Sequence, residues 1–151
     1  NIVKGRIYPL GGISNITTIL GNESGYYPII EMDEHGFNNP KGLYNINKVD
    51  IVLTGDSFTE GYSVNSDESI GEVLRMSGFN TISLGKTGNG PLVELAALKE
   101  YAEPLKPKII LWMYFVNDMG DLNERRTRKG PGGIRVGEME SSILILKTTI
   151  G

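Results

Sequence analysis

Three residues that together support acyl transfer stand in the middle of the chain, each shortly after an apolar run: Ser57, Gly88 and Asn117. A serine hydroxyl is a nucleophile, and catalysis by it needs hydrogen-bond donors aimed at the oxyanion that develops on an ester carbonyl. A glycine N–H and an asparagine side-chain amide are such donors. Residues of these types therefore have the groups that acyl transfer needs, provided that the fold brings the three separated segments together.

The segments between these residues carry strand and helix patterns. Short apolar runs predict buried strands, and apolar side chains at three- and four-residue spacing predict amphipathic helices. The order strand, helix, strand, helix, strand with short connections predicts a parallel α/β sheet. The predicted strands cover residues 51–54, 81–84 and 109–115, and the predicted helices cover residues 66–77 and 91–102.

The loops that follow the three strands are expected at one edge of the sheet, because ligands of open parallel sheets bind outside the carboxyl ends of the strands. They are Gly55–Gly61, Gly85–Pro91 and Val116–Asp118. If the second and third strands flank the first, as in flavodoxin-like order, the three loops are neighbours.

These loops resemble the SGNH (GDSL) hydrolases. Gly55-Asp56-Ser57 after a buried strand, Gly88 in the second loop and Asn117-Asp118 in the third resemble the family's first three blocks, in order. Each interval accommodates about one helix plus one strand. The segment Asp33–Pro40 also resembles one that precedes the serine block in some bacterial members. The resemblance covers residues 26–122.

The resemblance implies a three-layer α/β/α, flavodoxin-like fold and a serine esterase or acyl hydrolase. Ser57 would be the nucleophile, and the oxyanion hole would comprise the N–H groups of Ser57 and Gly88 with the Asn117 amide. Asp56 and Asp118 would shape their loops. The expected substrate is a small-molecule or carbohydrate ester, with carbohydrate O-acetyl esterase or acetyltransferase as examples, and neither a metal nor an organic cofactor is implied.

Two parts of the chain are expected to differ in character: a short antiparallel or irregular lead-in over residues 1–48, packed on the core, and a partial, truncated SGNH-like domain over residues 49–151. The family's late Asp-x-x-His block has no counterpart here, and the one histidine, His35, is expected to be a turn residue. Either the chain is a fragment or the protein has lost its base, so we expect this chain to be a poor esterase. The run Ile143–Leu146 is compatible with a helix or a strand.

Composition and charge limit the classes of partner and of chemistry that we expect for this chain. The net charge of −3 mixes 15 basic with 18 acidic side chains and argues against nucleic acid as a partner, and no apolar run is long enough to span a membrane. The absence of cysteine excludes thiolate chemistry and disulfides. Asn1 is neither an initiator methionine nor part of a signal segment, which predicts that the natural N-terminus lies upstream. Compartment and oligomeric state stay open.

A second reading needs no catalysis. Ser57 and Asn117 are also compatible with capping roles, and Gly88 with a turn. The chain would then be a flavodoxin-like binding module whose glycine-rich edge holds an anion or nucleotide at helix N-termini. A bound flavin would favour this module, and a covalent adduct on Ser57 would favour the hydrolase.

Overall fold

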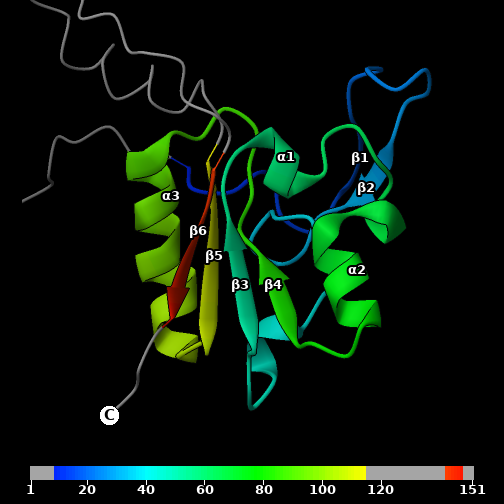
Figure 1. The fold of residues 1–151 in the computed structure, drawn as a ribbon. Coiled ribbons are helices and arrows are strands. Elements are labelled where there is room, and N and C mark those ends of the chain that lie inside the picture. Colours follow the sequence, from blue (N-terminus) through cyan, green and yellow to red (C-terminus); the bar gives the residue numbers. More distant parts are fainter. Residues whose placement is uncertain (1–8, 115–141, 148–151) are drawn as a thin grey trace, which may run out of the picture.

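A computed structural model describes residues 9–114 and 142–147 of the chain (Figure 1). Within them the strands are β1 (Thr17–Ile19), β2 (Ile29–Glu31), β3 (Ile51–Thr54), β4 (Thr81–Ser83), β5 (Ile109–Tyr114) and β6 (Ser142–Lys147). The α-helices are α1 (Ser57–Glu60), α2 (Ile70–Met76) and α3 (Pro91–Ala97). Single turns of other helix types are η1 (Leu43–Asn45), η2 (Ser66–Glu68), η3 (Leu98–Ala102) and η4 (Glu103–Leu105).

The fold is mixed α/β, with three parallel strands flanked by helices (Figure 1). The sequence predicted this fold class and the parallel strands. β3 pairs in parallel with β4 on one side and with β5 on the other. Its residues are all buried, which explains the uninterrupted apolar run. Because β3 lies between the other two parallel strands, the loops that follow β3 and β4 are neighbours at one edge.

The sheet departs from the all-parallel arrangement at its fourth strand. β6 pairs antiparallel with β5, with Ile109 opposite Lys147 and Tyr114 opposite Ser142. The run Ile143–Leu146, which the pattern left open between helix and strand, is therefore part of a strand. An antiparallel strand needs no crossover helix before it, so the strand–helix–strand pattern does not predict β6.

The helix predicted over residues 66–77 is α2, and it begins at Ile70, later than predicted. Ser66 starts the separate 3₁₀ turn η2, and Ser69 caps α2 by accepting a hydrogen bond from the Glu72 N–H at 3.2 Å. The apolar side chains Ile70 and Val73 of α2 are exposed rather than buried. Both residues are serines, whose hydroxyl can cap a helix, so residue type at this boundary does not distinguish the two starting points.

The N-terminal lead-in forms a small hairpin, β1 antiparallel to β2, and then enters the main core. Phe37 is fully buried in the same apolar cluster as Val52, Ile82 and Leu84 of the sheet and Ala97 of α3. Among the described residues, no helix has both the length and the apolar character needed to cross a membrane.

Candidate active site

The first loop places Ser57 at the carboxyl end of the buried strand β3. Asp56 is the N-cap of α1, and its carboxylate accepts a hydrogen bond from the Phe58 N–H at 3.0 Å. Ser57 is the first residue of this helix and is half-buried. No described group forms a hydrogen bond with its hydroxyl. The capping function therefore belongs to Asp56, and no described residue engages the Ser57 hydroxyl.

The second loop places Gly88 in a tight turn after β4. The Asn89 N–H donates to the Lys86 carbonyl at 3.1 Å, which closes the turn. Gly88 has φ +81°, the value that the third residue of a type II turn requires and that glycine adopts without strain. Its N–H has no acceptor among the described residues. Gly88 is therefore a turn glycine whose donor is unused.

The two loops are packed directly against each other. The Lys86 N–H donates to the Gly55 carbonyl at 3.2 Å. Gly85 lies so close to α1 that a Cβ there would come within 2.6 Å of the Thr59 Cβ, so only glycine fits. Gly85 thus has a packing role, which is separate from the exposed turn position of Gly88.

A buried carboxylate that the sequence reading missed joins these loops. Glu60, at the end of α1, is 1% exposed and accepts hydrogen bonds from Lys86 Nζ at 2.7 Å and from the Thr87 N–H at 2.7 Å. The Thr87 hydroxyl donates to the same carboxylate. An acidic residue at a helix end ordinarily indicates a solvated position, so no local signal marks Glu60 as buried.

The third predicted site residue lies outside the described residues. Asn117 and Asp118 follow β5, whose last described residue is Tyr114. The described structure brings the loops of Ser57 and Gly88 to one edge of the sheet. Convergence of Asn117 with them stays a prediction.

His35 has a structural environment, as the turn prediction implied. Its ring lies 4.5 Å from that of Tyr44 and 4.9 Å from that of Tyr101, measured between centroids. Within the described part of the chain, no hydrogen bond joins its side chain to Ser57. Burial, and then the nearby Asp33 carboxylate, raise the pKa of Tyr44 far above its usual value, so this aromatic group stays neutral.

Two polar residues of the lead-in, Asp33 and Asn38, form hydrogen bonds that support the candidate site. Asp33 is fully buried, and its carboxylate accepts hydrogen bonds from the N–H groups of His35 and Phe37 and from the side chains of Asn39 and Tyr44. A neighbouring amide, that of Asn38, donates to the Glu60 carbonyl at 2.8 Å and so holds the end of α1.

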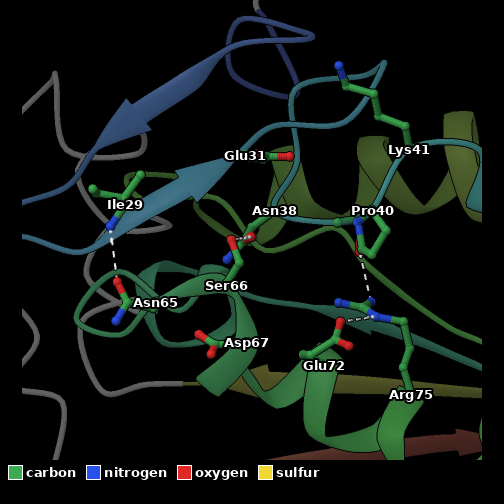
Figure 2. A pocket seen from close by; sticks show the side chains of 11 residues that line it. Ile29, Glu31, Asn38, Pro40, Lys41, Asn65, Ser66, Asp67, Glu72 and Arg75 are labelled. Carbon is green, nitrogen blue, oxygen red and sulfur yellow. Dashed lines mark hydrogen bonds and ion pairs between the residues drawn. The ribbon is translucent and has the colours of Figure 1, made fainter.

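A pocket of about 590 Å³ opens between β2, η2 and the start of α2, and neither Ser57 nor Gly88 lines it (Figure 2). Arg75 crosses its wall, where it forms a 2.8 Å ion pair with Glu72 and donates to the Asn39 side chain at 3.3 Å. Ser66 donates to Asn38 at 2.9 Å on the same wall. Because these side chains are engaged with one another, the wall of the pocket connects the lead-in to α2.

The described residues contain no cluster of three or more histidine, cysteine, aspartate or glutamate side chains arranged to hold a metal ion. Comparison with protein-family models, with curated proteins and with solved structures found no match to this chain. The chemistry of the site must therefore be argued from its own residues.

Proposed function

We propose that this chain carries the nucleophile and part of the oxyanion hole of an SGNH-type serine ester hydrolase or acyltransferase. One observation carries the proposal: Ser57 begins α1 at the carboxyl end of a buried strand, half-buried and with a hydroxyl that no described group engages. A serine kept for structure at this position would cap the helix, but Asp56 already does so. The free hydroxyl is what nucleophilic catalysis requires.

The second loop supplies a donor of the right kind. The Gly88 N–H has no acceptor in the described part of the chain, and it belongs to a loop that is packed against the helix of Ser57. In the proposed reaction this N–H, together with the Ser57 N–H and the Asn117 amide, stabilises the negative charge on the carbonyl oxygen of a bound ester.

The proposed reaction proceeds through an acyl-enzyme. The Ser57 oxygen attacks the ester carbonyl, the alcohol leaves with a proton, and water or a second alcohol then removes the acyl group from Ser57. The substrate is an ester of a small molecule or a carbohydrate, and no metal or organic cofactor takes part. Because His35 contacts Tyr44 and Tyr101, the acceptor of the Ser57 proton in this proposal is a group beyond the described residues.

The anion- or nucleotide-binding alternative has less support. Its donors would come from the glycine-rich edge, yet the Thr87 N–H and hydroxyl are already bound to the Glu60 carboxylate. These two donors are therefore not available to a bound anion. In addition, α1 has only 4 residues, so its dipole is small.

A fluorophosphonate probe tests the proposal, with imidazole added as an external proton acceptor. We expect a phosphonyl adduct located at Ser57 by mass spectrometry, faster with imidazole and absent in Ser57→Ala. The exposed Ser14 serves as a matched control, and Ser14→Ala should label like the wild type. His35→Ala should also keep the labelling rate, because its ring contacts are structural.

Slow labelling without imidazole and a complete lack of labelling have different meanings. Without imidazole the rate should be low, since loss of the nucleophile's base costs on the order of 10⁴–10⁶ in turnover in other serine hydrolases. No adduct at Ser57 with or without imidazole would refute the hydrolase function. Tight retention of a flavin by the purified protein would then favour the binding module.

A further inference from the structure

The Glu60 carboxylate joins the two halves of the proposed site. It lies one helical turn after Ser57 on α1, and its two partners, Lys86 and Thr87, directly precede Gly88. Its own carbonyl is held by the Asn38 amide at 2.8 Å. One side chain thus links the helix of the nucleophile to the turn that carries the candidate oxyanion donor.

This link occupies a buried position. The Glu60 side chain is 1% exposed and that of Lys86 is 24% exposed, and their charged atoms are 2.7 Å apart. A buried carboxylate is costly to desolvate unless it is paired and hydrogen-bonded, and this one has the ammonium, a backbone N–H and a hydroxyl as partners. Moving the turn away would leave the charge without partners, so the arrangement strongly favours one position of residues 86–88.

The link also directs which N–H is free. Because Glu60 binds the Thr87 N–H and the Asn89 N–H closes the turn onto the Lys86 carbonyl, the Gly88 N–H between them is the one left unpaired. Oxyanion donors are effective when they are held in place before the charge develops. We propose that Glu60 is a positioning residue that holds the Gly88 N–H in place relative to Ser57, a role that rests on the proposed ester hydrolase function.

The test combines two variants and a matched control. Glu60→Gln removes the charge and keeps the shape, and Thr87→Val removes one of the donors to this carboxylate and nearly keeps the side-chain shape, at an exposed position. Glu100→Gln makes the same chemical change at an exposed carboxylate and serves as the control. Circular dichroism and urea unfolding establish that each variant is folded under the conditions of the assay.

Two measurements are made on each variant. We expect fluorophosphonate labelling of Ser57, with imidazole, to slow on the order of 10- to 100-fold in Glu60→Gln, because a small misplacement of a catalytic group has effects of this size. Labelling of Thr87→Val should slow less, and that of Glu100→Gln should not change. Hydrogen exchange at the Thr87 amide should accelerate about 10-fold or more in Glu60→Gln, because the acceptor of its hydrogen bond loses its charge and the bond weakens.

The outcomes separate this role from the proposed function. If folded Glu60→Gln labels as fast as the wild type, the positioning role is wrong while the esterase proposal stands. If the Thr87 amide exchanges equally fast in both proteins, the link itself is refuted. If the wild type forms no adduct at Ser57, the proposed function fails, and the catalytic role of Glu60 fails with it.

Discussion

The Asn39 side chain pairs with both backbone groups of Ser83, 44 residues further along the chain: its amide nitrogen donates to the Ser83 carbonyl and its oxygen accepts the Ser83 N–H, each at 2.8 Å. β4 is an edge strand of the sheet, so these two groups have no strand partner on that side. Asn39 satisfies them as a neighbouring strand would and closes the edge to other chains.

Replacing Asn39 should therefore destabilise the fold. We expect Asn39→Ala to lower the free energy of unfolding by about 2–4 kcal/mol, because buried backbone groups of Ser83 lose their partners. Asn47→Ala, at an exposed asparagine, should change it by less than about 0.5 kcal/mol. Urea unfolding measures both, and equal effects of the two substitutions would contradict the pairing.

Alanine substitutions at the neighbouring residues Asp56 and Ser57 should differ in their effect on the free energy of unfolding. Asp56→Ala removes the N-cap of α1 and should cost about 1 kcal/mol of unfolding free energy. Ser57→Ala should cost less than about 0.5 kcal/mol, since no described group engages its hydroxyl. Denaturant titration checks the order, and a larger loss in Ser57→Ala would indicate that this serine is structural.

The two glycines of the second loop should respond differently to alanine. Gly85→Ala places a Cβ within 2.6 Å of the Thr59 Cβ and should cost about 3 kcal/mol or more, because a helix must shift to admit it. Gly88→Ala meets no atom within 4 Å and has only the penalty of positive φ, about 1–2 kcal/mol. Chemical unfolding of both variants tests this order, which a reversal would disprove.

Asp50 should make stability depend on pH. The hydrogen bond from Lys108 Nζ at 2.7 Å, and then that from the Asn80 N–H, hold the pKa of Asp50 below its usual 3.8. A carboxyl with a lower pKa in the folded state stabilises it above the unfolded pKa, and the contribution is lost as pH falls through the folded value. The stability gap between wild type and Asp50→Asn should thus be largest near neutral pH and shrink below pH 3.8.

Urea unfolding at several pH values between neutral and about 3 measures this gap. Asp67→Asn makes the same chemical change at an exposed carboxylate with no hydrogen bond among the described residues, and it is the control for the substitution itself. A gap that stays constant, or widens toward acid, would show that Asp50 does not act through its charge.

Local patterns in the sequence determined the elements that carry the site. The apolar run Ile51–Thr54 predicted a fully buried strand, and the structure has it at that position. The alternation of strands with helices predicted parallel strands, and the structure has β3 paired in parallel with β4 and β5. The turn residues of the lead-in left a hairpin and an irregular segment open, and the structure has the hairpin. Burial periodicity is a property of neighbouring residues, and so it is visible without a structure.

Tertiary structure decided which polar side chains are buried and paired around the candidate site. Glu60 pairs with Lys86, and Asn39 pairs with Ser83, across intervals of sequence that no periodicity spans. In the sequence Glu60, Lys86 and Asn39 have the character of solvated positions, because a charged or amide side chain is usually exposed. Their burial is favourable only when distant partners arrive together and compensate the lost hydration, and that condition exists only in the folded chain.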